Sequence, residues 1–256
     1  HVWDNYPYSN FNRKFYLSND HVACISKLTH DIVQTVAPEV DSSYVPHAVN
    51  PDIFKPQAVE EIKRWRTSKN LDDKFVCFWN SRNARRKQSG TLIWWFKEFL
   101  DKIGHDNACL IMHTDTKDQH GQDLEAIISE LGLTNGEVLF SKDKVNAADL
   151  AGMYNMADLT ICISDAEGFG LSTLESLSCG TPILVNMTGG LQDQVTDGEK
   201  FFGIGLQPAS KAIIGSQQVP YIYEDRLNKD DFINALVELY EMTPEARREL
   251  GMAGRA

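Results

Sequence analysis

The sequence predicts an α/β fold in which a Rossmann-like parallel sheet carries helices on both of its faces. Short apolar segments recur along the chain without strict alternation of polar and apolar residues, which is typical of strands buried on both faces. Amphipathic helical patterns separate most of these segments, and a strand–helix alternation of this length builds a parallel sheet. The 256 residues are enough for one large or two modest domains.

The predicted strands are four to six residues long and rich in Val, Ile, Phe and Cys. They are HVACIS at 21–26, KFVCFW at 74–79, ACLIM at 108–112, EVLF at 137–140, LTICI at 159–163 and PILV at 182–185. Ligands of parallel sheets bind at the carboxyl ends of the strands, so the loops that follow these segments are the places to search for a site.

Helical patterns fill the intervals between the strands. Leu92, Trp95 and Phe96 begin an apolar stripe with the spacing of one helix face, and Gly104 follows as a stop signal. The same spacing, in one case after the cap residue Asn146, predicts the other helices. The predicted helices lie at 89–103, 121–131, 146–157 and 229–241, and from Pro244 to Leu250.

Two regions are predicted along the chain. Residues 1–18 are aromatic and polar with no clear period, and we interpret them as a connector or as the tail of a preceding domain. Residues 19–256 carry the strand–helix alternation and form the predicted ligand-binding domain. Because the chain begins at His1 without Met and ends inside a helical pattern, we expect it to be a piece of a longer protein.

Composition narrows the range of partners. The 36 acidic and 25 basic residues give a net charge of −11, which argues against nucleic acid as a partner. No apolar run is long enough to cross a bilayer and the start has no signal-peptide pattern, which leaves only peripheral contact with a membrane. The five cysteines are spread singly, mostly in apolar segments, and we expect buried reduced thiols in a cytoplasmic protein.

A dense cationic cluster follows the strand that ends at Trp79. We call residues 81–88 the cationic loop, and its basic residues are Arg82, Arg85, Arg86 and Lys87. Arginine can clamp a phosphate through paired N–H donors, and lysine binds it as a point charge. The alternative interpretation is a solvated basic loop, and the spacing alone favours neither.

A glycine-rich loop, residues 164–170, follows the strand that ends at Ile163. Glu167 lies inside it and Glu175 beyond it, while Gly168 and Gly170 let the backbone approach a ligand closely. The helix predicted to start near Leu171 offers free N–H groups and the positive end of its dipole. The pattern predicts a diphosphate over the helix start with a carboxylate on each flank, since carboxylates accept paired sugar hydroxyls.

A competing interpretation needs no ligand for Glu175. The segment STLE at 172–175 fits a capping box, in which Ser172 caps the helix and Glu175 bonds back to the Ser172 amide. It leaves Glu167 and the glycines unexplained. Further along the chain, Gly189 and Gly190 follow the strand that ends at Val185. They permit either a second close approach of the backbone to a ligand or an ordinary turn before a short helix.

Other chemistries have weaker support. The segment HTDTKDQH at 113–120 lacks the spacing of a metal site, so we interpret it as a polar loop and predict no metal site. The chain has no GxxxxGK[ST] segment, which excludes a P-loop. GFGLST at 168–173 imitates a dinucleotide fingerprint, but Thr173 stands where its third glycine belongs.

Together these segments resemble the retaining glycosyltransferases of the GT-B fold, family 4 (glycosyl transferases group 1), and specifically their carboxyl-terminal, donor-binding domain. The resemblance covers residues 19–256. The matching motifs, in order, are PHAVNPDIFKP at 46–56, SRNARRK at 81–87 and the E-x7-E motif EGFGLSTLE at 167–175. Ala48 and Asn50 stand where the family has Gly and Asp, and Ser81 replaces a usual glycine.

The resemblance implies a role for each matching residue. Arg82 and Lys87 occupy the two basic positions that such enzymes aim at the donor diphosphate. Glu167 would contact the donor sugar as the catalytic residue, and Glu175 would bind the ribose hydroxyls. The remaining implied donor contacts are the backbone N–H groups around Phe169, Gly170, Leu171 and Ser172, and Val145 near the base.

The implied function is the transfer of a sugar from a nucleotide-diphosphate sugar to a glycan, lipid or protein acceptor, with retention of configuration and without a metal or other cofactor. The acceptor site would lie mostly on the preceding domain, so this piece alone is expected to bind donor without turnover. Two other functions compete: a catalytically silent nucleotide-binding or scaffolding module, and an NAD-dependent oxidoreductase that uses GFGLST.

Overall fold

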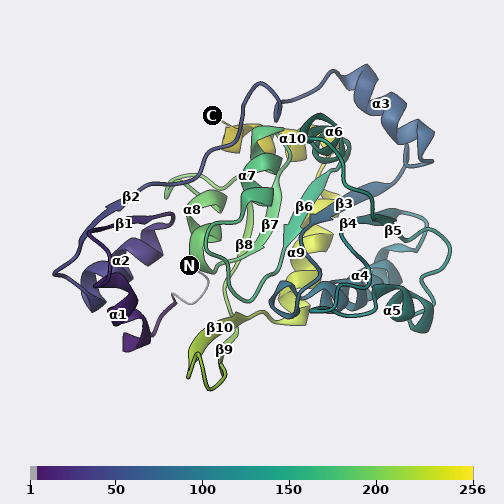
Figure 1. The fold of residues 1–256 in the computed structure, drawn as a ribbon. Helices are drawn as coiled ribbons and strands as arrows, with labels where there is room; N and C mark the ends of the chain where they lie inside the picture. Colours follow the sequence, from purple (N-terminus) through teal and green to yellow (C-terminus); the bar gives the residue numbers. More distant parts are fainter. Residues whose placement is uncertain (1–4, 256) are drawn as a thin grey trace.

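A parallel six-stranded sheet forms the centre of the protein (Figure 1). The structure is a computed structural model that describes residues 5–255. The strand order in the sheet is β5-β4-β3-β6-β7-β8, and every neighbouring pair is parallel. The strands are β3 Phe75–Asn80, β4 Ala108–His113, β5 Val138–Ser141, β6 Leu159–Cys162, β7 Ile183–Asn186 and β8 Gly203–Leu206. The predicted Rossmann-like fold class is confirmed.

Helices cover both faces of this sheet. Phe75, Cys77 and Trp79 of β3 enter one hydrophobic core, together with side chains of α4, α5 and α9. Val76 and Phe78 enter the opposite core with side chains of α6. Alternate side chains of one strand therefore fill two cores, which explains why the strand is apolar throughout. The helices of this region are α3 Val59–Ser68, α4 Ser89–Ile103, α5 Leu124–Glu130, α6 Ala147–Met156, α7 Leu171–Ser178, α8 Gln192–Val195, α9 Lys229–Glu241 and α10 Pro244–Arg255, with 3-10 turns η2 Arg85–Lys87 and η3 Gly189–Leu191.

A smaller unit precedes the large sheet. β1 His21–Cys24 and β2 Asp41–Tyr44 form a separate two-stranded parallel sheet, joined by α2 Lys27–Val36. The turn η1 Asn10–Asn12 and helix α1 Arg13–Tyr16 pack beside it, with Tyr16 in the same core as residues of α2. The strand expected at 21–26 is present, but its placement in the large sheet is wrong. Most of β1 is solvent-accessible, which does not suit a strand covered on both faces.

The antiparallel hairpin of β9 Ser210–Ile214 and β10 Ile222–Arg226 was not expected from the sequence. β10 reads Ile-Tyr-Glu-Asp-Arg, so its charged residues hide it from a search for apolar segments. β8 was missed as well, because its two glycines lower strand propensity. One of them is required by packing, since a Cβ on Gly203 would lie 1.8 Å from the carbonyl oxygen of Ile183 in β7.

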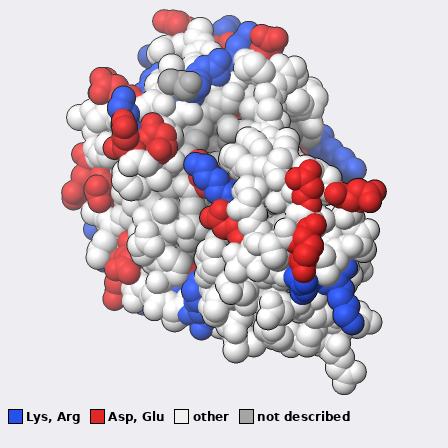
Figure 2. All heavy atoms as spheres, turned by 90° about the vertical axis from the view of Figure 1, so that its left-hand side faces the viewer, with Lys and Arg blue, Asp and Glu red and all other residues white. Residues whose placement is uncertain are grey.

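Surface properties of the described residues add two facts. None of the helices in this part of the chain is both long enough and apolar enough to cross a bilayer. Figure 2 shows basic and acidic side chains interspersed over the face that carries the small unit, rather than gathered into one basic area. The charge distribution on this face is therefore mixed.

Candidate functional site

Glu167 lies in the glycine-rich loop just beyond the carboxyl end of β6, and its side chain is only 7% exposed. Ser164 donates a hydrogen bond of 2.8 Å to its Oε1, and Lys87 donates another to the same oxygen. The guanidinium of Arg86 lies 3.3 Å from that oxygen. Burial acts to raise the pKa of Glu167, but the charges of Lys87 and Arg86 and the hydrogen bonds from Lys87 and Ser164 outweigh it, and the pKa is lowered. Glu167 is therefore an anion paired with two cations.

The basic side chains at the end of the cationic loop point to different acceptors. Arg86 donates a hydrogen bond of 2.7 Å to the carbonyl oxygen of Ala166, in addition to its contact with Glu167. Arg85 turns to the hairpin instead, where it donates two hydrogen bonds of 2.9 and 2.7 Å to the buried Glu224 of β10. Lys87 and Arg86 thus face the glycine-rich loop, while Arg85 joins the cationic loop to the hairpin.

Arg82 lies apart from this group. Its Nε and Nη2 donate hydrogen bonds of 2.6 and 3.1 Å to the two oxygens of Asp118, and Nη2 lies 2.7 Å from Nδ1 of His120. The side chain is 60% exposed. Of the two basic residues expected at a diphosphate, the structure brings Lys87 to Glu167 and gives Arg82 a different carboxylate.

The N-terminus of α7 is shaped by Gly170, whose φ of +92° lies in the left-handed region. Gln194 donates hydrogen bonds of 2.6 and 3.1 Å to the carbonyl oxygens of Phe169 and Gly170. In a trans peptide the C=O and N–H point in opposite directions, so the N–H groups of Gly170 and Leu171 point away from Gln194. Together with the amide of Ser172 in the first helical turn, these N–H groups form the positive end of the helix, which is the kind of helix end that can bind an anion.

Glu175 does not belong to a capping box, and that interpretation is wrong. α7 starts at Leu171 and has Gly170 at its N-cap, so Ser172 is already inside the helix and no side chain caps it. The Oε2 of Glu175 instead accepts a hydrogen bond of 2.6 Å from the hydroxyl of Tyr154, which itself accepts one of 2.9 Å from Asn80. Burial raises the pKa of Glu175, although the bond from Tyr154 opposes this.

The glycine pair after β7 packs against the glycine-rich loop. A Cβ on Gly189 would lie 1.6 Å from the carbonyl oxygen of Glu167, and one on Gly190 would lie 2.6 Å from the Cα of Phe169. The amide of Gly190 also donates a hydrogen bond of 3.3 Å to the Glu167 carbonyl oxygen. Close approach of the backbone is thus the reason for these glycines, and the group they approach is the loop that carries Glu167.

Several residues around the site were not identified from the sequence. Tyr154 reads as part of the apolar stripe of α6, and nothing in that pattern shows that its hydroxyl meets Glu175. Gln194 lies in a short helix that was one of the alternatives after Gly189 and Gly190, but its role was not predicted, and Glu224 lies in a hairpin that was not expected. His47, in the segment 46–56, packs edge-on against Phe169 with ring centroids 5.1 Å apart. Val145 lies half-buried beyond β5, and its contact with a base stays a prediction.

The side chains of segment 113–120 have separate partners. His113 bonds to Ser141 at 2.9 Å, while Asp118 and His120 hold Arg82. Among the described residues, no group of three or more His, Cys, Asp or Glu side chains is arranged to hold a metal ion. This segment therefore acts as a polar support for the cationic loop.

We expect Arg82→Ala to lower the affinity for nucleoside diphosphates by about two- to fivefold, because an exposed guanidinium shared with Asp118 contributes modestly. Calorimetry on this variant measures the change in affinity. Lys102→Ala, which removes an exposed lysine of α4, is the control for the loss of one positive charge. Unchanged affinity would remove Arg82 from the donor site and leave Lys87 as the cation that matters.

Comparison with known proteins identifies the family. The model of "Glycosyl transferases group 1" matches residues 59–256, which is more than half of the chain. D-inositol 3-phosphate glycosyltransferase of Arthrobacter sp. (strain FB24) is 34% identical over 109 residues, 43% of this chain and 25% of that protein. A GDP-mannose-dependent alpha-(1-6)-phosphatidylinositol monomannoside mannosyltransferase of Mycolicibacterium smegmatis is 27% identical over 188 residues, 70% of this chain and 47% of that protein. The chain thus spans about half or less of the length of these relatives.

Solved structures agree on the fold. Sucrose-phosphate synthase from Thermosynechococcus elongatus superposes with a TM-score of 0.73 and 23% identity, over 95% of this chain and 54% of that one. Anabaena HepE in complex with UDP and glucose superposes with a TM-score of 0.73 and 17% identity, over the whole of this chain and 64% of that one. The sheet and its helices correspond to one half of a GT-B structure, and the chain belongs to the glycosyl transferases group 1 family.

Proposed function

We propose that this chain is the donor-binding half of a retaining glycosyltransferase that moves a sugar from a nucleotide-diphosphate sugar to an acceptor. The observation that carries the proposal is the meeting of Lys87 with Glu167 beside the N-terminus of α7. A cation, a carboxylate and outward-pointing helix amides at one sheet edge provide the groups that a diphosphate and a sugar ring require.

The proposed chemistry follows from charge. When the bond between the anomeric carbon and the phosphate oxygen breaks, negative charge grows on the diphosphate and positive charge grows on the sugar. Lys87 and the amides of Gly170 and Leu171 are fixed donors that stabilise the negative charge on the diphosphate. Glu167 stays ionised, since its pKa is lowered, and in this proposal its carboxylate faces the sugar, where the positive charge develops. Because cations of the chain serve the diphosphate, we expect affinity for nucleoside diphosphates to be insensitive to EDTA.

A thermal-shift panel of UDP, GDP, ADP and their sugars tests this proposal on the chain itself. A ligand at about one hundred times its dissociation constant adds roughly 2.7 kcal/mol to the free energy of unfolding. For a chain of this size that raises the melting temperature by about 5–10 °C. One base is expected to stabilise strongly, and none stabilising would contradict the proposal. Relatives are named for GDP-mannose and solved with UDP, so both bases belong in the panel.

Glu175→Gln is expected to separate ribose recognition from stability. The glutamine oxygen still accepts the bond from Tyr154, and burial already disfavours the ionised carboxylate, so the melting temperature should change little at pH 7. Affinity for a nucleoside diphosphate should fall about tenfold, because a charged acceptor of paired hydroxyls becomes neutral. Affinity for inorganic pyrophosphate, which has no ribose, is the internal control. Equal losses for both ligands would contradict the ribose role.

Turnover belongs to the longer protein in this proposal, because the chain covers only part of its relatives. We expect the chain alone to bind donor and transfer no sugar. A silent nucleotide-binding or scaffolding module would give the same binding, and donor turnover by the longer protein distinguishes the two. The salt-bridged, ionised Glu167 favours the enzyme, since a module that only held nucleotide would need no buried carboxylate at the sugar.

A further inference from the structure

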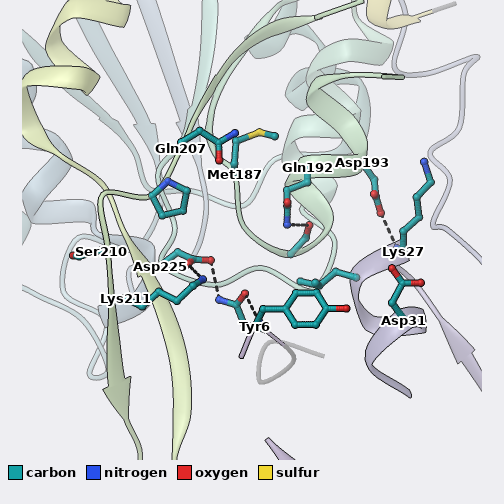
Figure 3. Close-up of a pocket in the computed structure, with 14 residues that line it drawn as sticks. Tyr6, Lys27, Asp31, Met187, Gln192, Asp193, Gln207, Ser210, Lys211 and Asp225 are labelled. Carbon is teal, nitrogen blue, oxygen red and sulfur yellow. Dashed lines mark hydrogen bonds and ion pairs between the residues drawn. The ribbon is translucent and has the colours of Figure 1, made fainter. Parts of the chain in front are cut away.

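A cavity lies between the small N-terminal unit and the large sheet. Its volume is about 560 Å³, and it is open to solvent and bordered by three parts of the chain: α2 with the residues around Tyr6, the segment from Met187 to Asp193, and the base of the β9–β10 hairpin. Figure 3 shows that side chains from these elements point toward one another across it. This cavity is separate from the side chains of Lys87 and Glu167, which do not line it.

One wall carries two carboxylates and an amine. The backbone amide of Lys27, at the start of α2, donates a hydrogen bond of 2.8 Å to Oδ2 of Asp193. Asp31 lies one helical turn further along α2, and in Figure 3 it sits on the same side of the cavity as Lys27 and Asp193. Burial raises the pKa of Asp193, and the charge of Asp31 adds to the rise while Lys27 opposes it. Lys27 is exposed, and in Figure 3 its side chain extends away from Asp31.

The opposite wall is built on Asp225 of β10, which is only 1% exposed. Asn5 donates a hydrogen bond of 2.8 Å to its Oδ2, and Lys211 pairs with its other oxygen. Gln207 and Ser210 line the cavity beside them, and both are exposed. The hairpin strands therefore contribute a hydroxyl and a charged pair to this wall, and the amide groups come from Asn5 and from Gln207, which precedes β9.

The chemistry of these walls selects a class of ligand. Three carboxylates and two amines line the cavity, so its net charge is −1 and an anionic ligand would face more acids than bases. Asp225 uses both of its oxygens on Asn5 and Lys211, and Asp193 uses one on the backbone amide of Lys27. Asp31 is therefore the lining carboxylate placed to accept paired hydroxyls, and the amide of Gln207 can both donate and accept, which together suit a neutral polyhydroxylated ring. The exposed ring of Tyr6 offers an aromatic face, whose negative quadrupole attracts the C–H groups of such a ring.

The cavity is joined directly to the donor site through the backbone. Gly189 lines it, and the same glycine packs against the carbonyl oxygen of Glu167. The amide of Asp225 donates a hydrogen bond of 2.9 Å to the carbonyl oxygen of Asp165, two residues before Glu167. A ligand in this cavity is therefore one backbone layer from the loop that carries the catalytic carboxylate.

We propose that this cavity receives the ring of the acceptor, that this ring is neutral and polyhydroxylated, as in a sugar or a cyclitol, and that the rest of the acceptor binds to the preceding domain. The proposal rests on the function proposed above and names its second substrate class. The β9–β10 hairpin, with α2, then sets acceptor specificity, while the cationic loop and α7 bind the donor.

The test uses the ¹⁵N-labelled chain and four neutral probes: glucose, mannose, N-acetylglucosamine and myo-inositol, each titrated to about 100 mM, which covers millimolar affinities. At least one probe is expected to shift the amide resonances of Gly189, Gln192 and Gln207. Asp31→Asn and Gln207→Ala, both at exposed side chains, should weaken that binding at least about tenfold. Asp106→Asn, an exposed aspartate in the turn after α4, is the matched control and should leave binding unchanged.

Nucleoside diphosphate binding is measured on the same samples to keep the two proposals apart. Two outcomes, each with nucleotide binding retained, would overturn the acceptor cavity and leave the donor site standing. In the first, no sugar shifts the resonances of these residues. In the second, a sugar binds, but Asp31→Asn and Gln207→Ala leave its affinity unchanged. Sugar binding at the cavity without any nucleotide binding overturns the proposed function. The proposal is supported only when sugar binding is at least about tenfold weaker in both variants, is unchanged in the control, and nucleotide affinity is unaffected by all three changes.

Discussion

Lys87→Ala is expected to lower the affinity for nucleoside diphosphates by about 10- to 100-fold, because it removes a cation from the sheet edge where we propose that the diphosphate binds. It should also cost stability, since Glu167 then stays buried with only Arg86 at 3.3 Å as a charged partner. Removing one member of a buried pair typically costs several kcal/mol, and we expect roughly 2–4 kcal/mol here, or about 5–15 °C in melting temperature.

A double variant separates these two effects. Lys87→Ala with Glu167→Gln removes both charges, so the melting temperature should recover while the affinity for nucleotide stays low. Lys102→Ala, at an exposed lysine of α4, is the control for general charge effects. Unchanged nucleotide affinity in Lys87→Ala, measured by calorimetry, would contradict the role of Lys87 whatever happens to stability.

Acid should act in the same direction as the Lys87 change. The folded-state pKa of Glu167 is lowered, so its pairing stabilises the fold above the unfolded pKa and is lost as pH falls through the folded value. Glu175 has the opposite shift, so its burial costs stability once the group ionises. Melting curves below pH 5 should therefore fall less steeply for Glu167→Gln than for the unchanged chain.

Gly189→Ala is expected to be the most destabilising single substitution near the site. A Cβ there would lie 1.6 Å from the carbonyl oxygen of Glu167, and the φ of +52° is already unfavourable for alanine. Because the obstacle is backbone, one of the two loops must shift, and we expect a loss of more than about 3 kcal/mol together with loss of nucleotide binding.

Gly132→Ala is the matched control for this substitution. Gly132 has a φ of +71°, but a Cβ there would meet no atom within 4 Å. It should therefore cost only the conformational penalty of about 1 kcal/mol. Similar melting temperatures for the two variants would show that the loops are not packed as closely as the structure has them.

The sequence predicted the parallel sheet and most of its helices because their signal is local. Buried strands such as β3 are apolar throughout, and α4 begins and ends where its stripe and Gly104 indicate. The helix expected at 121–131 is shorter, because Asp123 caps it by accepting a hydrogen bond from the amide of Ala126. The hairpin escaped prediction because its contacts, such as Arg85 with Glu224, are made by charged residues far apart in sequence.

The site itself was foreseen only in part. Glu167, Lys87 and the start of α7 lie together as their loop positions suggested. Arg82 pairs with Asp118, and Glu175 bonds to Tyr154 rather than to the helix start, because side chains choose among partners that tertiary packing supplies. Which of several cations in one loop meets a given carboxylate depends on the path of the backbone, and spacing alone does not contain that path.

The most direct measurement is a crystal structure of the chain with the nucleoside diphosphate that stabilises it most. We expect diphosphate oxygens within about 3.2 Å of Lys87 Nζ and of the backbone nitrogens of Leu171 or Ser172, with the ribose against Glu175. A diphosphate bound elsewhere, with Lys87 still held by Glu167 and the α7 amides facing solvent, would contradict the account.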